Sequence, residues 1–568
     1  MFDYFHEEFT PGQEAVLRRY FTNTDRPVFA LVNLPEVVKG ALFSRYSRTH
    51  LPLRSLFLKE FYEQPDTGIQ AIAAQAPHED YSAALKRAAA LYERVLSEYG
   101  DDSVAQLGGA HLACEQASNI LTKVLEWGRL AAYLEQSTRY IPYDRKLGGR
   151  SRYFVAPEVE AAPGLAARYR ADMDWLFGVY SELVRDMTLH FERVRPRKPG
   201  ELDQAWRTAL RTQAYDVARG LLPAATLSNV GIFASGQAYE AMLLRMRGHP
   251  LQEARDYADM MLTELNKVIP AFLRRVDNPE RGGVWTKYLS DIAQQTAEAA
   301  DRLLSDVEDG DSKAHQDVTL VEWDPDAEVK LVAAALYAHS DLPDDRLLAI
   351  VRKMGQRERE AVLKAYVGDR GNRRHRPGRA FERTSYRFDI LCDFGAFRDL
   401  QRHRMLTIEW QRLGTSHGYT TPPVIEETGR GAAWQGAMDR MASLHATVRD
   451  ACGPDVAQYA VPFACRIRFV MQMNAREALH MLELRTTQQG HASYRSICQE
   501  MHRLIRDQAG HKAIAAAMKF VDYEGYELAR LDAAKRAVKQ AAGAKDVQRK
   551  LQQKSLPGMD GAGGGSAQ

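Results

Sequence analysis

The sequence predicts a helix-rich α+β protein made of two tandem copies of one domain. The chain has 568 residues, of which 45% are hydrophobic and 26% charged, so it is long enough for two cores. Apolar residues recur at helical spacing in most segments, whereas residues 385–394 alternate apolar and polar positions as a strand does. Two long segments in different halves of the chain also share one pattern, which indicates a duplication.

The duplication is visible between LLPAATLSNVGIFASGQAYEAMLLRMRGHP, which starts at residue 221, and VPFACRIRFVMQMNAREALHMLELRTTQQG, which starts at residue 461. Two of the arginine pairs inside these segments share one offset, since 485−245 = 495−255 = 240. A repeat as long as a domain predicts a pseudo-dimer and excludes a solenoid of short repeats. The paired residues are Pro223 with Pro462, Arg245 with Arg485 and Arg255 with Arg495.

Composition divides the chain into four parts. Residues 1–60 are aromatic and basic, and we expect this leading segment to pack on the first domain, residues 61–311. An acidic, turn-rich stretch over residues 306–329 places the boundary near Ser312, so the second domain covers residues 312–540. Residues 541–568 end in LPGMDGAGGGSAQ, and we expect this tail to be flexible.

Helical periodicity predicts most of the elements between these boundaries. The Gly- and Pro-rich residues 147–164 indicate a loop. The expected helices cover residues 81–99, 103–140, 165–194 and 202–219, and a charged helix at the surface covers residues 522–554.

Charge and cysteine usage exclude several classes of protein. A net charge of +2 argues against a protein dedicated to wrapping nucleic acid. The chain has no run of 18 apolar residues and no cationic start before an apolar segment, so nothing indicates membrane insertion or export. The five cysteines show no zinc-binding spacing. We therefore expect a cytoplasmic protein without a metal site.

A basic triplet, Arg402, His403 and Arg404, lies inside the largely apolar stretch FRDLQRHRMLTIEWQ. Burying three such side chains is costly without anionic partners, so the triplet predicts an anion site. An exposed basic cluster is the plainer alternative. A second triplet at residues 374–376 lies among Gly and Pro, which indicates a solvated loop.

A helix with a polar start follows this triplet along the chain. Ala478, Leu479 and Leu482 have helical spacing, and Asn474 occupies the position of an N-cap. Arg476 lies in the first turn, and His480 follows four residues later on the same face. The start of this helix is therefore a second candidate ligand contact.

A strand, then RHR, then a helix that opens N-x-R and closes in LR resembles the flavin-dependent thymidylate synthases. The signature of that family continues from RHR into E-x-S-x-R, but in the second half these positions hold Trp410, Arg412 and Gly414. The first half has the missing part and lacks RHR. Its residues are Glu135, Ser137 and Arg139, with Trp127, Gly128 and Arg129 in place of RHR. Each half keeps what the other has lost.

The resemblance implies transfer of a one-carbon unit from methylene-tetrahydrofolate to dUMP, with FAD as cofactor and NADPH as hydride source. It implies one composite site between the halves, with the opposite site serving as scaffold, and a homodimer that mimics the family's tetramer. Arg485 would polarise the pyrimidine and so act catalytically. The implied FAD contacts are Arg402, His403, Arg404, Asn474, Arg476 and His480. The implied nucleotide contacts are Glu135, Ser137, Arg139, Arg219, Arg245 and Arg485.

Three positions depart from the family's pattern and keep alternatives open. The expected Gln before RHR is Asp399, the second-half counterpart of Arg219 is Gln458, and an expected His is Arg383. A flavoenzyme of the same scaffold that acts on another pyrimidine is therefore the first alternative. A non-catalytic nucleotide- or nucleic-acid-binding protein is the second, favoured by the Arg-rich residues 369–383. A salt bridge at a helix end is the plainer alternative for Glu135 and Arg139.

Overall fold

A computed structural model describes residues 3–34, 36–63, 106, 108–197, 199, 203–307 and 316–524. The helix expected at residues 81–99, the boundary at Ser312 and the flexible tail lie outside these residues, as does nearly all of the helix expected at 522–554.

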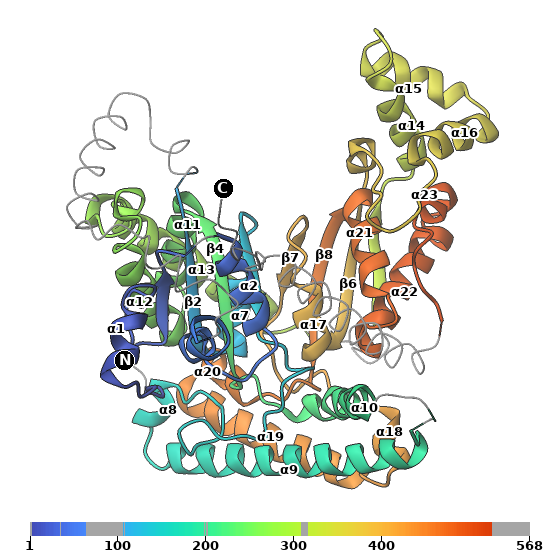
Figure 1. Cartoon of the computed structure of the whole chain (residues 1–568). Coiled ribbons are helices and arrows are strands. Elements are labelled where there is room, and N and C mark those ends of the chain that lie inside the picture. The colour runs from blue at the N-terminus through green and yellow to red at the C-terminus, as the bar shows by residue number, and fades with distance from the viewer. Residues whose placement is uncertain are drawn as a thin grey trace, which may run out of the picture.

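Two four-stranded antiparallel sheets stand side by side, one in each half of the chain (Figure 1). Both sheets have the same order, β1-β2-β4-β3 and β5-β6-β8-β7, as a duplication predicts. In the first sheet β1 is Val28–Leu31, β2 Gly109–Ser118, β3 Ala131–Glu135 and β4 Leu227–Ser235. In the second sheet β5 is Val318–Trp323, β6 Ser385–Asp393, β7 Thr407–Trp410 and β8 Arg466–Asn474.

Helices make up most of the remaining described chain. The first half contains α1 Pro11–Leu17, α2 Glu36–Tyr46, α3 Leu53–Phe57, α7 Asn119–Leu125, α8 Pro157–Ala161, α9 Leu165–Val194, α10 Asp203–Ala218, α11 Gly236–Arg247, α12 Gln252–Leu265 and α13 Val284–Leu304. The second half contains α14 Ala327–Tyr337, α15 Asp344–Lys353, α16 Gln356–Val367, α17 Phe394–Leu400, α18 Pro423–Glu427, α19 Gly431–Cys452, α20 Pro454–Ala457, α21 Ala475–Arg485, α22 Ala492–Asp507 and α23 Lys512–Ala517.

The long helix expected at residues 103–140 is wrong, because this stretch forms β2, α7 and β3 in turn. Residues 109–118 (GAHLACEQAS) are mostly good helix formers, but β2 pairs with both β1 and β4 in the middle of the sheet. Tertiary pairing therefore overrides local propensity. Ser118 then begins α7, because its hydroxyl accepts a hydrogen bond from Leu121 N at 3.0 Å. The helices expected at 165–194 and 202–219 are confirmed as α9 and α10.

Backbone contacts between the halves follow a local twofold symmetry. Ala224 N donates to Val461 O at 2.8 Å, and Phe463 N donates to Leu222 O at 2.8 Å. The two bonds are equivalent at an offset of 239 (463−224 = 461−222 = 239), and Pro223 and Pro462 pair across the centre. A self-complementary contact of this kind is what a twofold dimer makes.

The same offset of 239 relates the N-caps of α11 and α21, which are Ser235 and Asn474. With this offset Arg245 corresponds to Leu484 in the second copy. The predicted correspondence of Arg245 with Arg485, at an offset of 240, is therefore wrong by one residue.

The long helices α9 and α19 pack on each other beneath both sheets (Figure 1). The face of α9 that is buried carries Tyr169, Met173, Leu176 and Tyr180, which recur at three- and four-residue spacing. Beside this layer, Gly220 lies against Trp434 of α19, and a Cβ added at Gly220 would come within 2.6 Å of that ring. The glycine is therefore needed for the two halves to approach.

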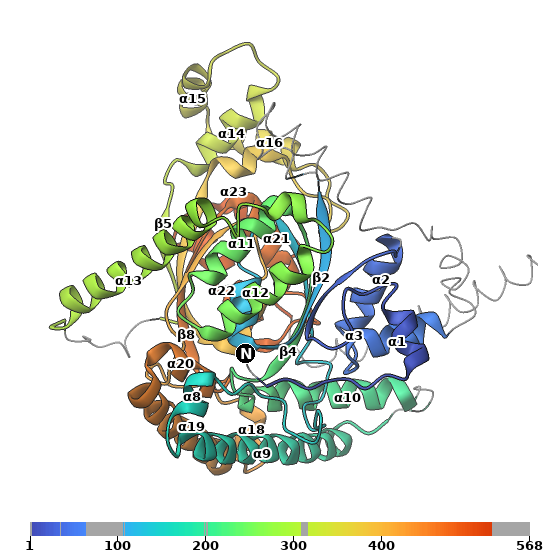
Figure 2. The ribbon, with the colours of Figure 1, turned by 90° about the vertical axis from the view of Figure 1, so that its left-hand side faces the viewer.

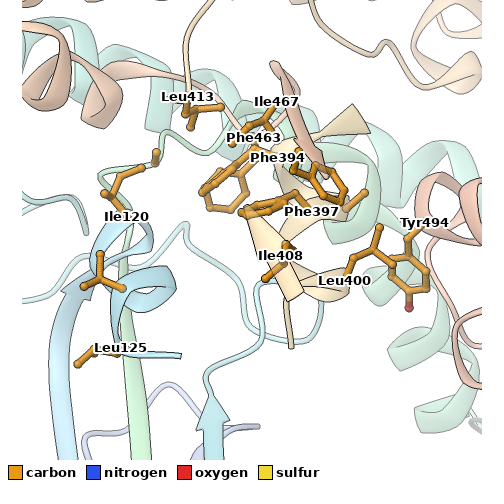
Figure 3. Packing of buried hydrophobic residues seen from close by; sticks show 14 of the residues in the cluster. Ile120, Leu125, Phe394, Phe397, Leu400, Ile408, Leu413, Phe463, Ile467 and Tyr494 are labelled. Atoms are coloured by element: carbon orange, nitrogen blue, oxygen red, sulfur yellow. The ribbon is translucent and has the colours of Figure 1, made fainter. Parts of the chain in front are cut away.

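One hydrophobic core runs through both halves and includes α7 and α17 (Figure 3). At its centre Phe397 is fully buried, and its ring centroid lies 5.0 Å from that of Phe469 and 5.6 Å from that of Trp410. Asp393 begins α17, since its carboxylate accepts from Ala396 N at 2.8 Å. The core thus fixes the helix that leads into Arg402.

Other segments lie at the edges of the molecule. The leading segment supplies β1 to the first sheet and forms a second small core with residues of β2 and β3. Helix α13 projects from the body, and α14 to α16 form a separate group of helices (Figure 2). None of the helices described here is long and apolar enough to cross a membrane.

Replacing Phe397 with Ala is expected to lower the free energy of unfolding by about 3–5 kcal/mol, because it leaves a cavity in the shared core. Urea denaturation followed by circular dichroism measures this loss. Met405→Ala is the control, since Met405 is 70% exposed and its loss is expected to change stability little. Equal effects of the two variants would contradict a core that runs through both halves.

Candidate functional site

Glu135 joins the two halves through buried ion pairs. It ends β3 of the first half, and its side chain is fully buried. Its Oε1 accepts from Arg398 Nη2 at 2.7 Å, and its Oε2 accepts from Arg402 Nη2, both of the second half. Lys123 of α7 lies 3.4 Å from Oε2. The acid of the first-half motif and an arginine of the second-half triplet therefore lie together at the junction, bound to each other as an ion pair. The assignments of Glu135 to a nucleotide and of Arg402 to FAD stay predictions.

These cations keep Glu135 ionised. Burial alone would raise the pKa of Glu135, but Arg398, Lys123 and Arg402 hold it well below its usual range. The carboxylate is thus a fixed negative charge that orients two guanidinium groups at the junction of the halves.

A second buried carboxylate, Asp399, lies among the arginines that the sequence assigns to substrate. Its carboxylate oxygens are 3.5 Å from Arg219 Nη1, 3.8 Å from Arg402 Nη1 and 3.9 Å from Arg485 Nη1. Burial would raise the pKa of Asp399, yet the arginines lower it far below its usual value, and Arg139 contributes to this effect. We call Arg139, Arg219, Arg402 and Arg485 the arginine cluster.

Arg139 reaches the cluster from the first half and is itself well anchored. Its Nε donates to Asp216 Oδ1 at 3.0 Å, and its Nη1 donates to the hydroxyl of Tyr494 at 2.9 Å. Ser137, two residues earlier, accepts a hydrogen bond from Arg139 N at 3.3 Å and is only half-buried. Asp216 and Tyr494 thus hold the guanidinium in place at the junction.

Two buried donors in the cluster have no hydrogen-bond partner in the described structure. They are Nη2 of Arg219 and Nε of Arg402. Buried guanidinium donors without an acceptor are costly, and an anionic group that reached either of them would supply one. The chemistry of the cluster therefore suits a phosphate or carboxylate group. Arg219 also lines a cavity of about 840 Å³ beside α10 and α17.

His403 links the basic triplet to Arg485. Arg485 Nε donates to His403 Nε2 at 3.0 Å, so the ring proton of the neutral imidazole lies on Nδ1, which is 2.8 Å from Glu477 Oε1. Burial lowers the pKa of His403 to about 4, and the neighbouring Arg485 adds to the effect. His403 is therefore a neutral positioning group for Arg485.

His403, Glu477 and His480 also place three potential metal ligands within 4.8 Å of one another. Each histidine is hydrogen-bonded to Glu477, and the guanidinium of Arg485 contacts the other nitrogen of His403. A cation beside that guanidinium would be repelled. We interpret the group as a hydrogen-bond network that orients Arg485.

The other residues assigned to the cofactor lie on the start of α21. Asn474 is its N-cap, as expected, and accepts from Glu477 N at 2.9 Å. Arg476 donates to Pro377 O at 3.0 Å and so faces the loop before β6. His480 lies behind His403, with ring centroids 5.4 Å apart. These residues adjoin the triplet but share no direct contact with the arginine cluster among the described residues.

Arg404 and Arg245 lie outside the arginine cluster. Both line a cavity of about 540 Å³ between the halves. Arg404 faces the ring of Tyr133 at 5.9 Å, and Arg245 stacks on Trp127 at 4.5 Å. Arg245, which the sequence assigns to the nucleotide, is thus not brought to the arginine cluster.

Two of the three departures from the family pattern lie away from the cluster. Gln458 accepts from Leu413 N at 3.0 Å, beside the second-half residues that correspond to Glu135, Ser137 and Arg139, so it lies at the opposite junction. Its first-half counterpart, Arg219, lies in the arginine cluster. Arg383 pairs with Asp344 at the surface. Of the three departures, only Asp399 lies in the arginine cluster.

Sequence reasoning missed several residues of this site. Arg398 precedes Arg402 by four residues, which is the spacing of one helix face, and Asp216 precedes Arg219 by three. These spacings were available signals. Glu477 likewise precedes His480 by three residues on α21. Lys123 and Tyr494 had no such signal, because only the packing of α7 and α22 brings them to the junction. The second triplet, residues 374–376, is exposed as expected.

Comparison with known proteins matches both halves of the chain to one family. The model described as thymidylate synthase complementing protein matches residues 60–271 and 319–509. A UPF0159 protein of Chlamydia muridarum is 38% identical over 526 residues, which cover 92% of this chain and 97% of that protein. A UPF0159 protein of Chlamydia pneumoniae is 39% identical over 93% of this chain and 97% of its own length. One from Thermoplasma acidophilum is 31% identical over 89% and 99%.

Replacing Glu135 with Gln is expected to destabilise the protein by about 3–5 kcal/mol at pH 7, because buried Arg398 loses its only described ionic partner and Lys123 and Arg402 each lose one of two. The pKa of Glu135 is depressed on folding, so its contribution is present above the unfolded pKa of about 4.3 and is lost as the pH falls below it. Unfolding free energies at pH 7 and pH 4 measure both effects. The wild type should lose more stability between these values than Glu135→Gln does.

Glu409→Gln is the control for that comparison, because Glu409 is exposed and forms no ion pair with a described residue. A wild type and a Glu135→Gln variant with the same pH dependence would show that the junction does not depend on this carboxylate.

Proposed function

Because the chain belongs to the thymidylate synthase complementing protein family, we propose that it transfers a one-carbon unit to a uracil nucleotide with FAD as cofactor. The proposed acceptor is dUMP, the carbon donor is methylene-tetrahydrofolate, and the hydride source is NADPH. One composite site between the halves would carry the reaction, and the chain would act as a homodimer in the cytoplasm.

The single observation that supports this proposal most is the meeting of complementary motifs. Arg139 and Arg219 come from the first half, Arg402 and Arg485 come from the second, and all four surround Asp399. Neither half contains the full set. The unpartnered donors of Arg219 and Arg402 favour an anionic ligand at this place.

The residues of the cluster take distinct parts in the proposed reaction. Arg139, Arg219 and the hydroxyl of Ser137 would bind the phosphate. Arg485, oriented by neutral His403, would place its charge beside the pyrimidine ring. A fixed cation there stabilises negative charge that develops on the ring in the transition state, so carbon 5 becomes nucleophilic.

The cysteines agree with a reaction that needs no enzyme thiolate. Four of the five are buried, and burial raises the pKa of all five thiols. A thiol held in its neutral form is a poor nucleophile. Arg485 would therefore activate carbon 5 without help from a cysteine thiolate.

The triplet and the start of α21 would hold the flavin, through Arg402, His403, Arg404, Asn474, Arg476 and His480. Arg404 fits this part, because it is half-buried and forms no ion pair with a described carboxylate. The bound flavin would supply the redox chemistry of the reaction.

Asp399 favours one alternative, a flavoenzyme of the same scaffold that acts on another pyrimidine. It stands where the family pattern has Gln, and it already neutralises part of the charge of the arginine cluster. A ligand with less negative charge than dUMP, or with a hydrogen-bond donor facing Asp399, would suit that carboxylate better.

The visible spectrum of the purified full chain tests the proposal. We expect about one flavin per chain for a single composite site, a spectral change on adding dUMP, and dTMP formation with methylene-tetrahydrofolate and NADPH. Flavin without dTMP formation, but with turnover of another pyrimidine, would support the alternative. Colourless protein that stays colourless after incubation with FAD would refute both.

Arg485→Gln is expected to lower kcat for dTMP formation by about 100-fold or more, because it removes one preorganised charge from the transition state. Flavin content should stay unchanged. Arg383→Gln is the control, since Arg383 pairs with Asp344 at the surface. A loss of flavin that parallels the loss of kcat would mean that Arg485 holds the cofactor instead.

A further inference from the structure

A cavity of about 840 Å³ lies between the halves, beside the arginine cluster. Of the four arginines in that cluster, Arg219 alone lines the cavity. Its Nη1 lies 3.5 Å from Asp399, whereas a Cβ added at Gly395, on the cavity wall, would lie 3.3 Å from its Nη2. Arg219 therefore stands on the boundary between the cluster and a separate space.

Two glycines on the cavity wall stand where the other junction has larger side chains. Helix α17 and its counterpart α7 both begin directly after the second strand of their sheet, and their second residues are Gly395 and Ile120. Gly220 corresponds to Tyr459 at the offset of 239. The ring of Trp434 takes part of the room beside Gly220, and the rest belongs to the cavity.

At the other junction the same place is filled and hydrogen-bonded. The hydroxyl of Tyr459 donates to Glu253 Oε2 at 2.7 Å, and Ser118 Oγ donates to the same oxygen at 2.6 Å. The counterparts of Ser118 and Glu253 are Asp393, which begins α17, and Ser493, the second residue of α22. There the acid and the hydroxyl are exchanged, and glycine replaces the phenol. Sequence divergence has therefore opened at one junction a space that side chains fill at the other.

Trp434 contributes a buried donor to the wall of this cavity. Its side chain is 3% exposed, and its Nε1 has no hydrogen-bond partner in the described structure. A buried indole N–H usually has an acceptor, because leaving it without one is costly. Nη2 of Arg219 is also without a partner and is open to an acceptor from either side of the boundary. The cavity therefore lacks acceptors that a ligand could bring.

The charges on the wall do not favour an anion. Buried and exposed groups together, the acids are Asp216, Asp317, Asp393 and Glu427, and the bases are Arg195, Arg219 and Arg466. Arg219 already has Asp399 at 3.5 Å on its other side. Burial raises the pKa of Asp393, although Arg219 opposes this effect. Since the acids outnumber the bases, a neutral ligand suits the cavity better than an anion.

The remaining wall is mostly apolar and comes from both halves. Phe191 and Val217 belong to the first half, and Phe463 and Ile497 belong to the second. An apolar wall with a few well-placed polar groups is the usual form of a small-molecule site.

We propose that this cavity binds a small, neutral, largely apolar molecule that carries a carbonyl acceptor, as an aromatic amide does. Trp434 Nε1 donates to the carbonyl oxygen, and the apolar wall covers the rest of the molecule. The site involves neither flavin nor nucleotide, so it does not rest on the proposed function.

The indole N–H of Trp434 reports on this cavity directly. The full chain labelled with ¹⁵N-tryptophan has 7 indole signals, and Trp434→Phe identifies the one from Trp434. The probes are 1-naphthamide, 1-naphthoate and naphthalene, which share a ring system and differ in acceptor and charge. We expect 1-naphthamide to shift the Trp434 signal downfield and to bind about fivefold or more tightly than either of the others.

Variants separate this site from binding elsewhere and from a defect in folding. Val217→Trp fills the cavity from the half-buried side of α10 and leaves all charges in place, so it should abolish binding of 1-naphthamide. Thr208→Trp, on the exposed side of the same helix, is its control. Trp434→Phe keeps an aromatic ring but removes the donor, so calorimetry should show affinity about fivefold weaker. Trp175→Phe is the control, since Trp175 is 36% exposed. All four variants should keep the melting temperature of the wild type.

Equal binding of the three probes would show an apolar cavity without the acceptor contact, and tighter binding of 1-naphthoate would show an anion site. Either result refutes the proposal. It is also wrong if no probe shifts the Trp434 signal, or if Val217→Trp with an unchanged melting temperature binds 1-naphthamide as the wild type does.

Discussion

The arrangement of the two halves depends on one buried carboxylate. Glu135 lies at the end of β3, an edge strand of the first sheet. It binds Arg398 on α17 and Arg402 in the turn after α17, both in the second half. Without these cations a buried carboxylate would be neutral. Without the carboxylate Arg398 would keep no described ionic partner, whereas Lys123 would keep Glu126 at 2.6 Å and Arg402 would keep only Asp399 at 3.8 Å. The shared core around Phe397 supplies the rigid surroundings, and the ion pairs set how the two sheets face each other.

The second constraint follows from the first. Because the halves meet about a local twofold, two equivalent junctions exist, but only one has an acid on one side and the basic triplet on the other. The opposite junction has Trp410 and Trp127 at the corresponding places, and there Arg412 pairs with Asp455 and Gln458 bonds the backbone of Leu413. The two junctions are therefore equivalent in backbone and different in chemistry.

Much of this organisation could be predicted from the sequence, because the spacing of residues within a motif can be read without knowing the tertiary structure. The duplication, strand β6 and the capped helix α21 were all expected. The first-half motif and the basic triplet were expected to lie near one site, but the ion pair between Glu135 and Arg402 was not. The failures have physical causes. Strand β2 was taken for helix because its residues favour a helix and only pairing on both sides makes it a strand. Arg245 was aligned one residue out of register, because only the N-caps Ser235 and Asn474 fix how the two helices correspond. The junction to which Gln458 belongs stayed open, because a sequence does not show which copy faces which. Asp399 was noted as a departure, but its contacts with three arginines appear only in the fold.

The contact between Gly220 and Trp434 shows how sequence differences between the two copies change the packing at a junction. At the offset of 239, the counterpart of Gly220 is Tyr459, so a glycine in one half corresponds to a large ring in the other. Tyr459 lies at the equivalent junction on the other side of the local twofold, where its ring packs on Phe154 with centroids 5.1 Å apart and its hydroxyl donates to Glu253 at 2.7 Å. The same position therefore packs a glycine against an indole ring at one junction and a phenol ring against a different set of neighbours at the other. The two junctions have equivalent backbone bonds but different side-chain packing, so a second copy of one half could not replace the other half without a change at both positions.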